Sequence, residues 1–337
     1  MDGIKLAIVG ATGAVGQEMI KVLQERNLPV DKLFCLAHPS EAGQIIKYGR
    51  EEIKVQPVAE EFFKEADLAL FAVSSELSKE LAPLAVENRC VVIDNSSAFR
   101  LEDEVPLVVP EVNPRDIEGH KGVIANPNCS TIILAVALYP LHKAAHIQRV
   151  LVSTYQAVSG AGIAGIEELN RQISDYLEGN VMQPQAFNYA IAFNVIPQID
   201  VLTASDYYNE EMKLVHETRK IMHSPEMRIA ATAVRVPVFR SHSESVALET
   251  EKRLSAEEAR DILLSSPGIV VQDDPQENIY PMPLLAADHD EVYVGRIRQD
   301  LSSDHGLLFW VVADQIRKGA ATNAVQIAEI VINNNWL

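Results

Sequence analysis

The strongest local signal for chemistry in this sequence is a cysteine inside the stretch Asn126-Pro-Asn-Cys129-Ser-Thr131. A strand is predicted to end just before Cys129, and an apolar helix is predicted to follow it. Backbone N–H groups and the helix dipole at such a terminus lower the pKa of a thiol, and the thiolate is the nucleophile. We therefore predict that Cys129 is a nucleophile. Cys35 and Cys90 lie inside apolar strands and are predicted to be small buried hydrophobes.

Two further segments carry side chains suited to acyl chemistry. Arg235 and His242 lie on either side of a predicted strand-to-strand connection. A guanidinium group forks onto a carboxylate, and an imidazole titrates near neutral pH. Gln156 stands near a strand end before the turn 159–162, where its amide could orient an acyl group. Residue type alone leaves a surface glutamine in a turn equally open.

Three charged residues are ambiguous from the sequence. Glu217 and Lys220 are three apart on a predicted helix, where they could grip an ammonium group and a phosphate or form a solvated ion pair. Arg100 follows a strand of the N-terminal half and, alone, is typical of a surface loop. For all three, the solvated alternative is favoured on residue type.

A glycine-rich turn, Gly10-Ala-Thr-Gly13-Ala-Val-Gly16, lies between the first predicted strand and the first predicted helix. Glycines in this place let the backbone approach a pyrophosphate, which the helix N-terminus stabilises. The spacing is GxxGxxG rather than the common GxGxxG. The turn predicts a dinucleotide site. After the second strand, Glu41 would favour NAD and Ser40 would accommodate the phosphate of NADP, or Glu41 is a solvated loop charge, and the residues leave this choice open.

The elements that must position these residues change in character along the chain. Up to residue 125, short apolar runs alternate with helical patterns, which predicts a doubly wound, mostly parallel sheet. After Cys129, longer strand-like segments alternate with helices, which predicts an α+β domain with a large mixed or antiparallel sheet. The tail 320–332 is apolar at helical spacing and is expected to pack on the first domain. We predict one domain from residues 1–127 and 319–337, and a second from 128–318.

Composition narrows the class of protein. The net charge of −18 would repel a phosphate backbone, so nucleic acid is an unexpected partner. The start of the chain lacks the pattern of a signal peptide, and the apolar run 132–141 is too short to span a bilayer. Three scattered cysteines provide neither a disulfide framework nor a metal knuckle. We expect a soluble, untargeted protein without a metal.

Eight motifs in order along the chain resemble the aspartate-semialdehyde dehydrogenase family over nearly the whole length. They are GATGAVG at 10–16, IDNSSAFR at 93–100, VPEVNP at 109–114, NPNCST at 126–131, TYQAVSGAG at 154–162, AFNVIPQID at 192–200, RVPVFRSHSES at 235–245 and KGAATNAVQIAE at 318–329. No single motif is sufficient, but their order and spacing are highly specific.

The resemblance implies a Rossmann-like dinucleotide-binding domain, a catalytic and dimerisation domain, and a cytoplasmic homodimer or homotetramer. It implies NADP(H) as the cofactor, with NAD(H) as the alternative. The roles that it implies are Cys129 as nucleophile, Gln156 positioning the intermediate, His242 as general acid/base, Arg235 binding the substrate carboxylate, Glu217 its amino group, and Arg100 and Lys220 the phosphate. The implied cofactor-site residues are Gly10, Thr12, Gly13, Ala14, Val15, Gly16, Ser40, Ser159, Gly160 and Asn323.

The implied reaction is the reversible, NADPH-dependent reductive dephosphorylation of β-aspartyl phosphate to aspartate β-semialdehyde through a cysteine thioester. It serves the synthesis of lysine and diaminopimelate, threonine and methionine. One alternative is an N-acetylglutamyl-phosphate reductase, which usually carries Gly-Cys-Tyr where this chain has Asn128-Cys129-Ser130. Another is a catalytically silent nucleotide-binding paralogue. The chain also departs from many family members by lacking an arginine near Ser40 and by having Val73-Ser74-Ser75 in place of a Gly-Gly pair.

Overall fold

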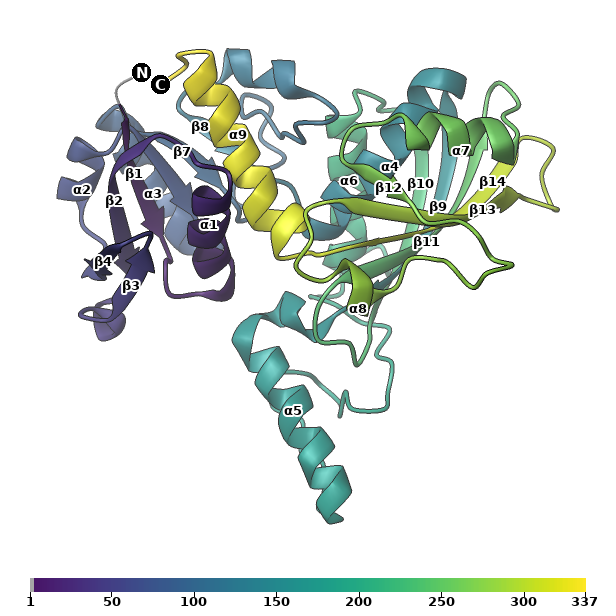
Figure 1. Cartoon of the computed structure of the whole chain (residues 1–337), viewed down its shortest axis with the longest axis horizontal. Coiled ribbons are helices and arrows are strands. Elements are labelled where there is room, and N and C mark those ends of the chain that lie inside the picture. Colours follow the sequence, from purple (N-terminus) through teal and green to yellow (C-terminus); the bar gives the residue numbers. More distant parts are fainter. Residues whose placement is uncertain (1–2) are drawn as a thin grey trace. The chain divides into compact units, whose positions relative to one another are not determined.

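The computed structural model describes residues 3–337, which form two compact units (Figure 1). The N-terminal unit contains the chain up to Asn128 together with Ala320–Leu337. The central unit is Cys129–Gly319. The chain therefore passes from the first unit into the second at Cys129 and returns after Gly319.

The N-terminal unit is built on a parallel sheet of order β5-β2-β1-β6-β7-β8. This arrangement confirms the predicted doubly wound sheet. Its strands are β1 (Ile4–Val9), β2 (Val30–Ala37), β5 (Gln56–Pro57), β6 (Leu68–Phe71), β7 (Val91–Asp94) and β8 (Val123–Ala125). Its helices are α1 (Ala14–Glu25), α2 (Glu60–Glu65), α3 (Ser75–Glu87) and α9 (Thr322–Asn333), with the short helices η1 (Pro39–Glu41) and η2 (Pro114–Gly119).

Helices cover both faces of this sheet because its strands are apolar on both sides. Leu6 and Ile8 of β1 share a core with residues of α1 and α9, whereas Ala7 and Val9 share one with α2 and α3. Successive side chains of a strand point to opposite faces, which explains this division. The tail therefore packs as expected, and α9, in yellow, lies beside the sheet (Figure 1).

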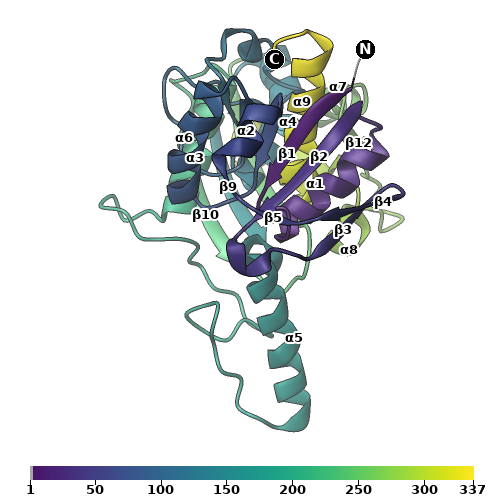
Figure 2. The same cartoon turned by 90° about the vertical axis from the view of Figure 1, so that its left-hand side faces the viewer.

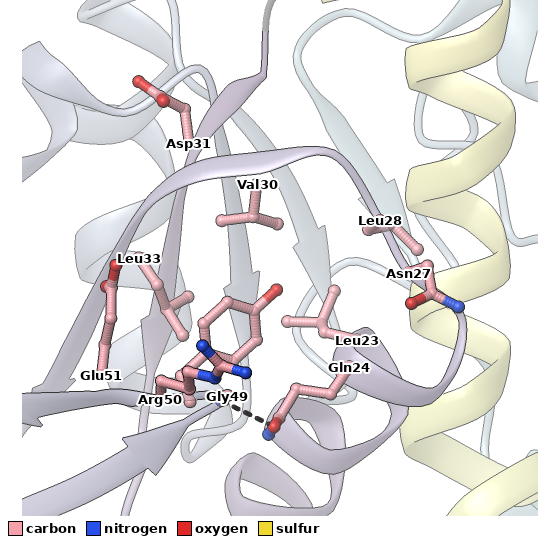
Figure 3. A pocket seen from close by; sticks show the side chains of 11 residues that line it. Leu23, Gln24, Asn27, Leu28, Val30, Asp31, Leu33, Gly49, Arg50 and Glu51 are labelled. Carbon is pink, nitrogen blue, oxygen red and sulfur yellow. Dashed lines mark hydrogen bonds between the residues drawn. The ribbon is translucent and has the colours of Figure 1, made fainter.

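A hairpin that the sequence did not predict, β3 (Ile45–Tyr48) with β4 (Glu51–Lys54), follows η1. Its turn is tied to α1, because the Gly49 N–H donates to Gln24 Oε1 at 2.8 Å. The hairpin borders a pocket whose lining side chains are drawn in Figure 3. None of the predicted site residues lines this pocket, so we do not treat it as the active site.

The central unit contains a mixed sheet of order β10-β9-β11-β14-β13-β12, which confirms the predicted α+β arrangement. The strands are β9 (Ile147–Gln156), β10 (Arg228–Arg235), β11 (His242–Thr250), β12 (Ile269–Val271), β13 (Val292–Gln299) and β14 (Gly306–Ala313). The helices are α4 (Cys129–Ala145), α5 (Gly162–Glu178), α6 (Asn209–Ile221), α7 (Ala256–Leu264) and α8 (Pro283–Ala286), with the short turns η3 (Val158–Ala161) and η4 (Arg317–Ala321).

Helix α4 is the central helix of this unit. It packs against four strands of the sheet and against both α6 and α7. Residues 130–138 are all buried, which accounts for a helix that is apolar on every side rather than on one stripe. The first turn of α4 is therefore held in a rigid setting.

Helix α5 extends away from the sheet of the central unit (Figure 2). The following segment, 179–208, contains no helix or strand. Buried Glu168 on α5 anchors it, since its Oε2 accepts from the backbone N–H groups of Gln185 and Ala186. We call α5 and the segment 179–208 together the α5 arm. Several large apolar side chains nevertheless remain exposed along it: Tyr176, Leu177, Val181, Tyr189, Phe193, Val195, Val201 and Leu202.

Candidate active site

Cys129 is the first residue of α4, as the sequence predicts. Its side chain is half-buried, in contrast to Cys35 and Cys90, which are fully buried and whose pKa burial raises to about 12. The helix dipole favours a negative charge at the position of Cys129. Gly319 lies against it, because a Cβ on that glycine would stand 3.0 Å from the Cys129 Cβ. The other two thiols are confirmed as structural hydrophobes.

Arg235 is the cation whose charge acts on Cys129. Burial lowers the pKa of this guanidinium, and the negative charges of Glu210 and Cys129 raise it. The attraction between Arg235 and the Cys129 anion is mutual, so the same interaction favours the thiolate. Arg235 is at the end of β10, and its Cζ lies 5.8 Å from the centre of the Phe187 ring. Helix terminus and arginine therefore act in the same direction on the sulfur.

One peptide group fixes Arg235 and His242 together. The Ala157 carbonyl accepts from Arg235 Nη1 at 2.7 Å, and the Ala157 N–H donates to His242 Nδ1 at 3.1 Å. The three residues come from the end of β10, the start of β11 and the turn after β9. The structure thus brings together two side chains that the sequence paired only by type.

The state of His242 follows from this geometry. Because Nδ1 accepts a hydrogen bond, the neutral ring carries its proton on Nε2. Within residues 3–337, Nε2 is buried and meets no hydrogen-bond partner. Burial, and secondly the charge of Arg235, hold the pKa of His242 well below its usual value. His242 is therefore a neutral donor with one unused N–H.

Gly160 forms the wall next to both side chains. A Cβ at this position would stand 2.6 Å from Arg235 Nη1 and 3.4 Å from His242 Nε2. Any side chain here would occupy the space beside the guanidinium and the imidazole. Gly160 itself is exposed, whereas its neighbour Ser159 is buried. The absence of a side chain on Gly160 therefore leaves room beside the two buried groups that the turn borders.

Gln156 is buried at the end of β9, so the alternative of a surface glutamine is wrong. Its Nε2 lies 3.3 Å from both Thr154 Oγ1 and Glu210 Oε1. Glu210 also accepts from Lys213 Nζ at 3.0 Å and raises the pKa of Arg235. Sequence reasoning missed Glu210.

Helix α6 carries Glu210 on the same side as two predicted site residues. Glu210, Lys213, Glu217 and Lys220 follow one another at spacings of three, four and three, which places them on one face. This spacing was the signal that could have revealed Glu210. Glu217 is 1% exposed and Lys220 is half-buried, so a fully solvated pair is wrong for Glu217. Helix α6 packs directly on α4, the helix of Cys129.

The glycine-rich turn of the N-terminal unit fits a dinucleotide. Gly10 has φ +88°, and a Cβ there would lie 2.3 Å from the Ala72 carbonyl oxygen. A Cβ on Gly16 would lie 2.2 Å from the Gly10 carbonyl oxygen, which explains the close approach of helix and strand. Gly13 is the N-cap of α1 and provides no side-chain cap. The turn, with Thr12, Ala14 and Val15, thus presents backbone and a helix terminus to a ligand.

Ser40, Arg100 and Asn323 are also in the N-terminal unit. Ser40 is exposed in η1, directly after β2, and its Oγ lies 2.8 Å from His38 Nδ1. Arg100 is buried and donates from Nε to the Asn126 carbonyl at 3.0 Å, so the surface-loop alternative is wrong. Asn323 is buried and donates to the Asn126 Oδ1 at 2.7 Å. Two predicted site residues therefore hold Asn126, three residues before the cysteine.

Two classes of function receive no support from the described residues. Between residues 3 and 337, no group of three His, Cys, Asp or Glu side chains is arranged to hold a metal ion. No helix in the same range is long and apolar enough to cross a membrane.

Comparison with known proteins agrees with this architecture. The model of the "Semialdehyde dehydrogenase, NAD binding domain" family matches residues 5–120, and that of the "Semialdehyde dehydrogenase, dimerisation domain" family matches residues 138–318. Aspartate-semialdehyde dehydrogenase from Aquifex aeolicus is 53% identical over 99% of this chain and 100% of its own. Aspartate semialdehyde dehydrogenase II from Vibrio cholerae, solved in complex with ASA, is 46% identical with a TM-score of 0.96, over 99% of each chain. The Candida albicans enzyme, solved with NADP, is 27% identical with a TM-score of 0.78, over 99% of this chain and 100% of its own.

The fold and the two family models define an oxidoreductase of the semialdehyde dehydrogenase class. Within that class, the chain belongs to the aspartate-semialdehyde dehydrogenase family, and it is an enzyme with that activity. The NAD binding domain model indicates a nicotinamide dinucleotide, NAD or NADP, as cofactor, and the dimerisation domain model indicates self-association.

Proposed function

We propose that this enzyme catalyses the reversible, NADPH-dependent conversion of β-aspartyl phosphate to aspartate β-semialdehyde through a thioester on Cys129. The proposal rests on one observation above all. Cys129 opens α4, the negative charge of its thiolate attracts Arg235, and Arg235 shares the Ala157 peptide with His242. A nucleophile, a carboxylate-binding cation and a proton donor are thereby supplied by one unit.

The substrate contacts follow from the chemistry of each side chain. Arg235 binds the substrate carboxylate, because a guanidinium forks onto it. Glu217 holds the amino group, as a buried carboxylate gains from a cationic partner. Arg100 and Lys220 bind the phosphate, an assignment supported by the family resemblance of their motifs. Gln156 orients the acyl group with its amide.

The protein's part in the reaction begins at the sulfur. The Cys129 thiolate attacks the acyl carbon of β-aspartyl phosphate, and the carbon–oxygen bond to phosphate breaks, which leaves the thioester. When bound, NADPH supplies the hydride that reduces this thioester. The Nε2–H of His242 donates a hydrogen bond to the oxygen that gains negative charge and stabilises it while the tetrahedral adduct exists. When the carbon–sulfur bond breaks, the oxygen re-forms the carbonyl and the proton remains on Nε2, which releases the aldehyde and returns the thiolate.

The N-terminal unit would hold the cofactor, and the central unit would provide catalysis and dimerisation. Gly10, Gly13 and Gly16 with Thr12, Ala14 and Val15 would take the pyrophosphate at the N-terminus of α1. Ser40, which is exposed after β2, would accommodate the 2′-phosphate of NADP. Ser159 and Gly160, with Asn323, complete the proposed set of cofactor residues.

The assembly proposed is a cytoplasmic homodimer or homotetramer that acts in the synthesis of lysine and diaminopimelate, threonine and methionine. The exposed apolar residues along the α5 arm support self-association, because a patch of this kind is normally covered by a partner. The description of the family model over residues 138–318 as a dimerisation domain supports the same conclusion.

One assay tests substrate and cofactor together. Phosphate-dependent oxidation of aspartate semialdehyde is measured against that of N-acetylglutamate semialdehyde, each with NAD and with NADP. The proposal expects kcat/KM to be highest for aspartate semialdehyde with NADP. A preference for the N-acetylated substrate would instead indicate an N-acetylglutamyl-phosphate reductase, and a preference for NAD would overturn the cofactor assignment. Absence of turnover with both substrates would indicate a silent nucleotide-binding paralogue.

A further inference from the structure

The residue directly before His242 has a strained backbone. Ser241 is fully buried and has φ +75°, in the left-handed region that favours glycine. Such a conformation is unfavourable for a residue that carries a side chain and persists only where the surroundings enforce it. Within the described part of the chain, its Oγ has no hydrogen-bond partner, whereas its backbone N–H donates to Gln315 Oε1 at 2.8 Å. Gln315 therefore acts directly on the strained residue.

The nitrogen of the Gln315 side-chain amide contacts the turn η3, which borders His242 and Arg235. Gln315 Nε2 donates to the Ser159 Oγ in η3. Ser159 follows Ala157 by two residues, and the Ala157 peptide binds both Arg235 and His242. One buried side chain thus spans the distance between the loop before His242 and the turn that carries its hydrogen-bond donor.

The backbone next to Gln315 is held in place by hydrogen bonds to Asp314. Asp314, just before Gln315, is fully buried, and its Oδ2 accepts from Arg240 Nε and from the Asp288 N–H. Its Oδ1 accepts from the backbone N–H groups of Ile316 and Arg317. The two residues after β14 therefore hold residues 240 and 241, the two that precede His242.

We propose that Gln315 is a positioning residue that keeps His242 in its reactive orientation by holding Ser241 and Ser159 at a fixed separation. The inference rests on the role proposed above for His242. Gln315 touches none of the proposed substrate-binding side chains by a described hydrogen bond, and its effect passes through the two loops.

Kinetics of Gln315→Ala test this role. We expect kcat to fall about 10–100-fold, because small misplacements of a reacting group have effects of this size. KM for aspartate semialdehyde should change by less than about 3-fold, since Arg235 keeps its own bond to the Ala157 carbonyl. The rate of Cys129 alkylation by iodoacetamide should match that of the wild type, because the start of α4 is not held by Gln315.

A double variant separates positioning from general destabilisation. Glycine adopts a positive φ without strain, so Ser241→Gly should allow the loop to keep its conformation without Gln315. Gln315→Ala combined with Ser241→Gly should therefore recover at least about ten-fold of the lost kcat. If the double variant recovers nothing, or if Gln315→Ala raises KM as much as it lowers kcat, the inference is overturned.

His242→Asn is measured in the same series so that two failures can be told apart. Full turnover in His242→Asn would show that the proposed function assigns the wrong proton donor. The positioning role inferred for Gln315 would then be overturned as well. An inactive His242→Asn together with a Gln315→Ala enzyme within about two-fold of wild-type kcat would leave the proposed function intact and overturn only the inference.

Discussion

At the scale of single residues, the candidate site depends as much on backbone as on side chains. Ala157 contributes only its peptide group, which fixes the Nδ1 of His242 and the Nη1 of Arg235 at the same time. A preorganised peptide needs no reorganisation when charge develops near it. The adjacent Gly160 acts by having no side chain, and this makes it the most direct residue to test.

Gly160→Ala should impair catalysis with little effect on folding. The added Cβ would stand 2.6 Å from Arg235 Nη1, so the guanidinium must move. We expect kcat/KM for aspartate semialdehyde to fall about 10–100-fold, with KM rising because the carboxylate contact is displaced. Gly119→Ala is the matched control, because no atom lies within 4 Å of a Cβ there. Equal kinetic constants for Gly160→Ala and the wild type would contradict the geometry.

A second residue-scale prediction concerns a buried acid. Glu244 is fully buried on β11, and neither carboxyl oxygen has a hydrogen-bond partner among the residues described. Burial raises its pKa well above the usual value. The folded protein therefore retains a proton that the unfolded chain releases above its own pKa of 4.5. The stability that this proton contributes is complete below pH 4.5 and is lost as pH rises through the folded-state pKa.

Glu244→Gln removes this titration, so its stability relative to the wild type should improve as pH rises from 5 towards the folded-state pKa of Glu244. The relative gain is at most about 1.4 kcal/mol for each pH unit inside the titration window. Thermal unfolding followed by circular dichroism at pH 5, 7 and 9 measures it. Glu251→Gln, at an exposed position just after the same strand, is the control. A difference between variant and wild type that stays constant with pH would refute the prediction.

At the scale of elements, periodicity predicted most of the fold. The apolar runs of β1, β6 and β7 and the helical spacing of α1 and α9 were sufficient, because their burial follows a regular pattern. The hairpin of β3 and β4 was missed, since all its strand residues are exposed or half-buried and each strand is only four residues long, which leaves too short an apolar pattern to detect.

The site was predictable to a lesser extent, and the reasons are physical. Cys129 could be found because its effect comes from the helix that it opens, which is local in sequence. The spacing along α6 offered a signal for Glu210, but its contact with Gln156 did not follow from the sequence, and neither did the contacts of Gln315 with Ser159 and Ser241, because these contacts join residues at least 54 positions apart. The burial of Arg100 likewise could not be predicted from the sequence, since its guanidinium is held by hydrogen bonds to the backbone carbonyls of Asn95 and Asn126.

We propose that the arm formed by α5 and residues 179–208 joins two copies of the chain. Leu177 is 77% exposed, and the Tyr176 ring lies tilted against that of Phe193 with 4.6 Å between ring centres, although both rings are exposed. We expect Leu177→Asp to weaken the proposed dimer by about 1–3 kcal/mol, because a charge would be placed in the proposed apolar interface. Sedimentation velocity at decreasing concentration detects the shift towards monomer.

Leu301→Asp provides the control for this experiment. Leu301 is fully exposed in the connection between β13 and β14 of the same unit, so the substitution adds the same charge away from the arm. An unchanged sedimentation coefficient for Leu177→Asp, or a wild-type protein that is already monomeric, would argue against the arm as the interface.

At the scale of the whole molecule, both points at which the chain passes between its two units lie next to Cys129. It leaves the N-terminal unit after Asn128, directly before Cys129, and returns to it after Gly319, the glycine that packs on Cys129. Asn126 is held by Arg100 and Asn323 within the N-terminal unit. Cys129 therefore directly follows the last residue of the proposed cofactor-binding unit in sequence, whereas its helix, α4, belongs to the proposed catalytic unit.

The thioester on Cys129 is the central claim, and a burst experiment without phosphate tests it most directly. Mixing the enzyme with aspartate semialdehyde and NADP should give one equivalent of NADPH per chain, and mass spectrometry should find an aspartyl adduct on the peptide that contains Cys129. Cys129→Ala should show neither signal and should lose at least about 10⁴-fold in turnover. A burst that survives in Cys129→Ala, or an adduct on another residue, would contradict the account.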